Sequence, residues 1–207
     1  PVFVPFIRYT LPVVFAGILS LLFNTADTIV VGQFVGESAV AAVGSTSALI
    51  GFIINFFLGI SMGATVKLAT DLGAGEKNLG RTVKTAYTLG IIVGLLTCVI
   101  GVSLAENMLI WMNTQNEILT DAVLYLRIYF LGQPAFMIFS FGRAVLSAYG
   151  ETKAPLYYLT ASGIVNVLLN LFFVIVCRQG VAGVAIATAI SQVLSAVLIT
   201  RKMMQMK

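Results

Sequence analysis

The residues of this sequence with the clearest capacity for chemistry are polar side chains set inside apolar segments, and Asp27 is the first of them. It lies in the run LPVVFAGILSLLFNTADTIVVGQ, residues 11–33, which contains no other charged residue. About twenty apolar residues span a bilayer as a helix. A carboxylate inside such a helix is costly and is functional by default. Asp27 is therefore our first candidate for a site.

Two asparagines are expected to reach the depth of Asp27. Asp27 lies fifteen residues beyond Pro12, which we take as the inner end of its helix. At 1.5 Å per residue this separation is about 22 Å along the helix axis. Asn166 and Asn170 lie eleven and fifteen residues beyond Pro155, the expected start of another outward-running segment. They are one helical turn apart and share one face.

A third segment begins near Gly183 on the outer side and carries Thr188 about one and a half turns inward. If the three segments are neighbours, they assemble a carboxylate, two amides and a hydroxyl. These oxygen ligands suit a hard monovalent cation such as Na⁺. Burial also favours a protonated carboxyl group, so Asp27 is equally a candidate to load and release H⁺. The alternative for the amides and the hydroxyl is interhelical hydrogen bonding alone.

A substrate cavity has weaker candidates. Tyr125 and Tyr129 lie on one face of a segment, toward the outside, where they could contact an aromatic or cationic ligand. Packing at the membrane interface is at least as good an interpretation of both tyrosines. Gln33 and Gln192 are two further polar positions that we assign to this cavity.

The composition places these residues in a membrane protein. The sequence is 59% hydrophobic and 10% charged, whereas soluble domains carry about 25% charged residues. We therefore interpret the net charge of +4 through membrane topology and expect no nucleic-acid partner. The sequence has no histidine and no nucleophile-elbow or P-loop motif, so we expect neither an enzyme nor a metal centre or organic cofactor.

Six apolar segments predict an all-α polytopic membrane protein, a single bundle of six transmembrane helices. Each segment is long enough to cross a bilayer as a helix, and continuous apolar runs do not fit the alternating pattern of a barrel. Pro134, inside the fourth segment, predicts a kink. The expected helices cover approximately residues 8–31, 39–65, 83–104, 122–149, 156–177 and 183–199.

The basic residues predict an orientation in the cell membrane. Most of them gather on one side of the bundle, which should be cytoplasmic, with both ends of this segment on that side. Arg143 and Arg127, near the inner and outer ends of the fourth segment, are expected to extend to the two interfaces. The cytoplasmic set consists of Arg8, Lys67, Lys77, Arg81, Lys84, Lys153, Arg201, Lys202 and Lys207.

The sequence resembles the multidrug and toxic compound extrusion (MATE) family over essentially its whole length. The order and spacing of several short motifs carry the resemblance. They are NTADT (24–28), VGQ (31–33), AVAAVG (39–44), GISMGA (59–64), GAG (73–75), GETKAP (150–155), NVLLN (166–170) and GVAIATAISQ (183–192).

The resemblance implies a twelve-helix antiporter in which two six-helix lobes face a central cavity and entry of H⁺ or Na⁺ drives export of organic cations or other drugs. This chain would be the amino-terminal lobe, and the missing carboxyl-terminal lobe would be its partner. Asp27 falls on the acid of the family's first helix, and Asn166, Asn170 and Thr188 fall on its partners. Some members have a second acid where this sequence has Asn170, so Asp27 would titrate alone here.

Two other functions remain open at this stage. A flippase for lipids or polysaccharide precursors would have the same broad fold, but it should need a large basic cavity, and Arg127 and Arg143 are the chief internal cations. The second is a half-length membrane fragment that does not transport. The sequence opens at Pro1 without a starting methionine, so we expect a fragment or an excised domain.

Overall fold

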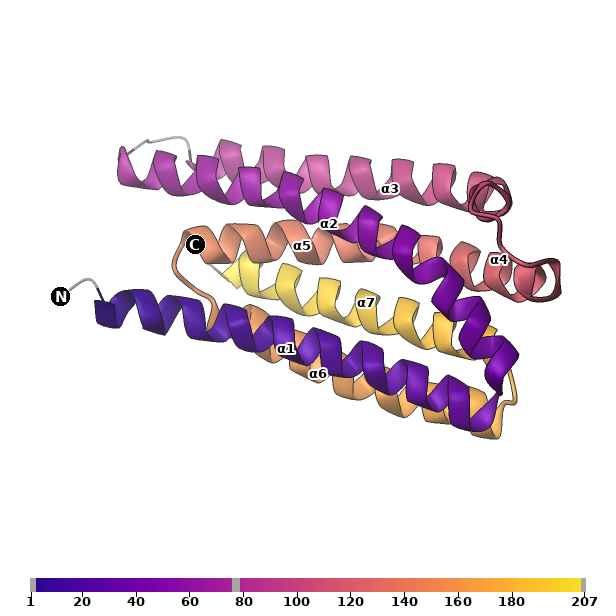
Figure 1. Cartoon of the computed structure of the whole chain (residues 1–207). Helices are drawn as coiled ribbons and strands as arrows, with labels where there is room; N and C mark the ends of the chain where they lie inside the picture. The colour runs from indigo at the N-terminus through magenta and orange to yellow at the C-terminus, as the bar shows by residue number, and fades with distance from the viewer. Residues whose placement is uncertain (1–2, 76–78, 206–207) are drawn as a thin grey trace.

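The computed structural model describes residues 3–75 and 79–205, and these two ranges contain helices and connections but no strand (Figure 1). Lys77 and Lys207, assigned above to the cytoplasmic side, lie outside the described residues. In chain order the elements are α1 (Phe3–Phe34), α2 (Glu37–Gly73), α3 (Leu79–Trp111), α4 (Asn116–Leu131), α5 (Gln133–Ala148), α6 (Lys153–Leu171), the π-helical turn η1 (Phe172–Val176) and α7 (Gly180–Gln205).

Five spans in the described ranges are long and apolar enough to cross a membrane, and α4 with α5 makes a sixth that is bent by 47°. The predicted all-α bundle is therefore confirmed. The bend lies at Gly132, two residues before Pro134. Proline has no N–H to give to the carbonyl of Phe130, so the helical ladder is interrupted there. The single fourth helix expected over 122–149 is thus two helices.

Successive spans run in alternate directions, so the first turn of α1 and the last turn of α7 lie at the same end of the bundle (Figure 1). The end of α2, the start of α3 and the turn from α5 to α6 lie there too. We call this the basic end, because the alternating direction of the spans brings together basic residues from five segments of the sequence. Those within the described ranges are Arg8, Lys67, Arg81, Lys84, Lys153, Arg201 and Lys202.

Glycines let α3 approach the bent span closely. A Cβ atom added to Gly94 would lie 2.7 Å from the Cα atom of Pro134. A Cβ atom on Gly101 would overlap the ring of Phe130. Small residues at such crossings allow membrane helices to gain van der Waals contact, which is a main source of their association in lipid.

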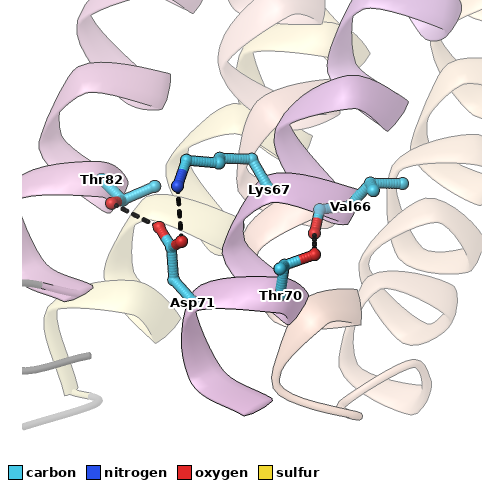
Figure 2. A network of polar contacts seen from close by, with 5 residues as sticks. All are labelled: Val66, Lys67, Thr70, Asp71 and Thr82. Atoms are coloured by element: carbon cyan, nitrogen blue, oxygen red, sulfur yellow. Dashed lines mark hydrogen bonds and ion pairs between the residues drawn. The ribbon is translucent and has the colours of Figure 1, made fainter. Parts of the chain in front are cut away.

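A polar contact of Asp71 also joins α2 to α3 near the basic end. Asp71 is 6% exposed. Its carboxylate accepts hydrogen bonds from Lys67 Nζ at 2.5 Å and from Thr82 Oγ1, on α3, at 3.1 Å (Figure 2). The neighbouring Thr70 instead bonds its own helix, donating to the Val66 carbonyl at 2.9 Å. The Lys67 side chain is largely exposed, which screens its ion pair. The hydrogen bond from Thr82 is the contact that fixes one helix end against the other.

The α3 crossing can be tested with Gly94→Ala. We expect the free energy of unfolding to fall by about 1–3 kcal/mol, because overpacking forces helices apart and the atom met by the new methyl group is backbone, at 2.7 Å. The measurement is thermal unfolding of the purified protein in detergent. Gly80→Ala is the matched control in the same helix, since no described atom lies within 4 Å of its added Cβ. If the two variants unfold at the same temperature, the close crossing is wrong.

Candidate functional site

The contact between α1 and α6 positions the candidate site. A Cβ atom on Gly163 would overlap the ring of Phe23, so the two helices approach this closely only with glycine at that position. Both helices run from the basic end toward the opposite end of the bundle (Figure 1). Asp27 follows Phe23 by one turn, and Asn166 and Asn170 follow Gly163 by about one and two turns. The three polar side chains therefore meet just beyond the glycine contact.

Hydrogen bonds then join α1 to α6. Asn170 Nδ2 donates to Asp27 Oδ1 and also lies 3.3 Å from Asn166 Oδ1. Asn170 is completely buried, and within the described part of the chain its own Oδ1 has no hydrogen-bond partner. Asp27 is thus held from its buried side by an amide nitrogen.

Asn166 extends the network to α7. Its Nδ2 lies 3.3 Å from Thr188 Oγ1, and the Thr188 hydroxyl donates to the Val184 carbonyl at 3.0 Å. With the Asn166 amide turned by 180°, its nitrogen donates to Asp27 Oδ1 at 2.8 Å and its oxygen accepts from the Thr188 backbone N–H at 3.2 Å. The hydrogen-bond partners select between such orientations. The turned one gives the shorter hydrogen bonds, 2.8 and 3.2 Å against 3.3 Å for each bond of the other. In both orientations Asp27, Asn166, Asn170 and Thr188 form one group.

A cavity of about 160 Å³ opens on the other side of Asp27, and Asp27 is the single charged residue in the described part of the chain that lines it. We call it the outer cavity. Most of its polar lining comes as a stripe from each of three helices. The stripes are Ser20, Asn24 and Asp27 on α1, Ser162 and Asn166 on α6, and Thr188, Ser191, Gln192 and Ser195 on α7.

The serines of these stripes are not among the residues predicted from the sequence. They nevertheless lie at helical spacing from Asp27, Asn166 and Thr188, which are. The hydroxyl protons of Ser162, Ser191 and Ser195 are used within their own helices. Ser162 donates to the Leu159 carbonyl at 3.0 Å, and Ser195 donates to the Ser191 carbonyl at 2.9 Å. A hydroxyl that donates to a carbonyl of the preceding helical turn keeps its oxygen lone pairs for other partners. The cavity wall is therefore rich in acceptors, which suits a cationic ligand.

The four candidates for a substrate cavity separate in the structure. Tyr129 and Gln192 line the outer cavity. Tyr125 stacks on Tyr129 with ring centroids 6.4 Å apart but lies in the hydrophobic core with valines of α1 and α7. Gln33 is exposed near the end of α1. Tyr125 thus serves packing: it shares a helix face with Tyr129, but one turn along the axis of α4 that face meets valines rather than the cavity.

Unpartnered amide atoms lie behind the outer cavity at the bend between α4 and α5. Gln133 is completely buried, and among the described atoms neither its Nε2 nor its Oε1 has a hydrogen-bond partner. Gln192 Oε1, buried in the same way, lies where a Cβ atom on Gly132 would be. Buried polar atoms of native proteins are normally paired with protein or with water. Tyr129, which lines the outer cavity, is the polar side chain beside both glutamines, so the bend holds a polar cluster next to the site.

A sequence model of the MatE family matches residues 12–172. The chain belongs to the MatE family. The match covers α1 through α6 with the start of η1, so it contains three of the four residues of the Asp27 group. The family resemblance proposed from the short motifs is confirmed.

Curated relatives of this MatE chain include bacterial multidrug resistance proteins. It is 27% identical over 190 residues to the "Probable multidrug resistance protein YoeA" of Bacillus subtilis (strain 168), covering 89% of this chain and 41% of that protein. It is 28% identical over 203 residues to the "Probable multidrug resistance protein NorM" of Thermotoga maritima, covering 94% of this chain and 43% of that protein. The chain thus spans less than half the length of these relatives.

Solved MatE-type structures share the fold. One, described as the outward-facing conformation of a multidrug resistance MATE family transporter, has a TM-score of 0.90 at 22% identity over 96% of this chain and 44% of that one. Another, a MATE in the bent conformation, has a TM-score of 0.89 at 23% identity over 95% of this chain and 44% of that one. The six-span bundle described above is therefore the arrangement of about half of such a transporter.

Asn170→Ala tests the buried side of the Asp27 group. Removal of the amide takes a donor from a carboxylate inside the membrane, and we expect the free energy of unfolding to fall by about 1 kcal/mol, the usual scale of interhelical hydrogen bonds in lipid. Thermal unfolding in detergent measures the change. Asn55→Ala is the control, since Asn55 is exposed and donates only to the Gly51 carbonyl of its own helix, at 2.7 Å. Equal unfolding temperatures for the two variants would contradict the assigned role of Asn170.

Proposed function

We propose that this chain is the amino-terminal lobe of a multidrug efflux transporter that exports organic cations or other drugs in exchange for an inward-moving cation. The observation that carries the proposal is Asp27, the single charged residue lining a cavity whose wall is otherwise acceptor-rich and apolar. Membership of the MatE family and the names of the curated relatives support transport rather than enzymatic catalysis.

Asp27 couples drug export to cation entry, because the drug and the incoming cation compete for its one negative charge. Ionised, it accepts a hydrogen bond from Asn170 on its buried side and attracts an organic cation on its open side. When an incoming cation neutralises the carboxylate, the attraction for the drug is lost and the drug leaves. Two ligands that need the same charge bind with negative coupling, and this coupling is reciprocal.

We further propose H⁺ as the coupling ion. The groups nearest to the carboxylate are amide nitrogens of Asn170 and, in its turned orientation, of Asn166. Such donors stabilise a carboxylate but repel a metal cation, so a Na⁺ site would require both amides to turn their oxygens inward. A proton needs no such shell of ligands. Na⁺ remains the alternative that the gradient experiment below separates.

The remaining parts of the transporter follow from length and topology. We propose that a second six-helix lobe faces α1 and α2, since the matched relatives are more than twice as long as this chain and large apolar side chains such as Phe52, Phe56 and Met62 are exposed on α2. We also propose that the basic end is cytoplasmic in the cell membrane, because Lys and Arg concentrate on that side of membrane proteins.

Neither alternative function gains support. The curated relatives cited above are named as multidrug resistance proteins rather than flippases. A half-length protein that does not transport is tested by reading the gene beyond Lys207. A frame that continues through six more apolar segments favours the two-lobe transporter, and a stop codon favours the fragment.

Asp27→Asn should abolish cation-coupled export by the complete gene product while leaving membrane insertion intact. The amide has nearly the shape of the carboxylate but carries no charge for either ligand. Export of tetraphenylphosphonium from proteoliposomes measures the effect, and we expect a loss of at least about tenfold, the scale of losing a charge-assisted hydrogen bond. Asp121→Asn removes an exposed carboxylate of α4 and should export normally. Normal export by the Asp27 variant would refute the proposed function.

The coupling ion is tested by imposing an H⁺ gradient and a Na⁺ gradient separately on proteoliposomes that contain the unmodified protein. We expect tetraphenylphosphonium export with the H⁺ gradient alone and none with the Na⁺ gradient alone, because the amides around Asp27 present donors. Export driven by Na⁺ in the absence of an H⁺ gradient would overturn the choice of ion and leave the role of Asp27 standing.

A further inference from the structure

A second cavity, of about 410 Å³, continues the outer cavity toward the basic end, and we call it the inner cavity. The two share Phe139 and Leu159 as lining residues. On α1 the inner cavity is lined from Tyr9 to Ala16 and the outer cavity from Ser20 to Asp27. They are therefore successive parts of one path along α1. The volume of the inner cavity falls in the range of small-molecule sites, about 300–1,000 Å³.

Among the described residues, Arg143 is the single charged one that lines the inner cavity. It lies on α5 in the same helical stripe as Ser140 and Ser147, which line the cavity as well. In residues 3–75 and 79–205 no carboxylate lies within ion-pairing distance of Arg143. The sequence led us to expect this side chain at the inner interface, but the fold turns it toward a cavity.

An arginine in this position calls for an anion. A charged residue within a membrane span normally pairs with an opposite charge or marks a ligand path. The guanidinium presents its donors in a planar fork that matches a carboxylate or phosphate. Most of the surrounding wall is apolar, including Leu58, Met62 and Leu156.

From this geometry we propose that the inner cavity binds the carboxylate or phosphate of an amphiphile through Arg143, with the apolar part of the molecule against the hydrophobic wall. The proposal deepens the proposed function and rests on it for the step of transport. It adds anionic amphiphiles to the substrates, with their anionic group in the inner cavity. Organic cations remain ligands of Asp27 in the outer cavity, about 15 Å or more farther along the axis of α1 at 1.5 Å per residue.

Binding of dansyl-labelled undecanoic acid to the complete gene product in nanodiscs tests the site directly. The unmodified protein should bind the acid at least about tenfold more tightly than its uncharged methyl ester, because the ester lacks the charge-assisted hydrogen bonds. Equal affinity for acid and ester would overturn the proposal without any variant.

Arg143→Gln should weaken binding of the acid by at least about tenfold and leave the ester unaffected. The matched control is Arg127→Gln, which removes an exposed charge from the other half of the same bent span. The Arg127 guanidinium lies 3.4 Å from a carboxylate oxygen of Glu106. Retained tetraphenylphosphonium binding would show that the Arg143 variant is folded. Unchanged binding of the acid by Arg143→Gln, or an equal loss in both variants, would overturn the site.

Two further experiments complete the test. The first identifies the source of the anion, and the second distinguishes this proposal from the proposed function. If phosphatidylglycerol in the nanodisc competes with the acid and phosphatidylcholine does not, the natural ligand is a lipid headgroup. If neither lipid competes, it is a soluble amphiphile. Asp27→Asn should still bind the acid at unchanged affinity. Failure of cation-driven export by the unmodified protein, with binding of the acid intact, would therefore count against the coupling scheme alone.

Discussion

The structure depends on keeping the carboxylate of Asp27 inside a membrane span. Lipid offers nothing in place of the water that solvates an acid, so the protein must provide the hydrogen bonds. Asn170 does so from a fully buried position on α6, and Asn166 connects the pair to Thr188 on α7. This requirement fixes which helices are neighbours and sets the register between α1 and α6. It also leaves one side of the acid free to face the cavity.

Glycine makes this arrangement possible within a bilayer. Apolar side chains gain little by leaving lipid for protein, so membrane helices associate through close van der Waals contact. Gly163 admits the ring of Phe23 just before the Asp27 group, and Gly94 brings α3 against the bend at Pro134. Each contact lies where two helices must be closest. The bend in turn carries Tyr129 to the outer cavity and Arg143 to the inner one.

The path along α1 has opposite charges in its two cavities. The outer cavity contains one acid and many acceptor oxygens, and the inner cavity contains one arginine in a largely apolar wall. A cation and an anion entering this lobe would therefore come to rest at different depths. Phe139 and Leu159, which both cavities share, separate the two charges by apolar groups, so neither charge neutralises the other by direct pairing.

The sequence by itself determined the membrane class, the six spans, the cost of an acid at Asp27 and the depth of Asn166, Asn170 and Thr188. These properties follow from composition and from the fixed rise of a helix. It also contained the serine stripes, whose spacing repeats every turn, although we did not extract them. The sequence also indicated the bend of the fourth span, through Pro134. Only the tertiary structure decided that Tyr125 belongs to the core while Tyr129 lines the cavity, and that Arg143 lines a cavity. The physical reason is that helical periodicity gives a residue its depth and its face, while what that face meets depends on the packing of helices distant in the chain.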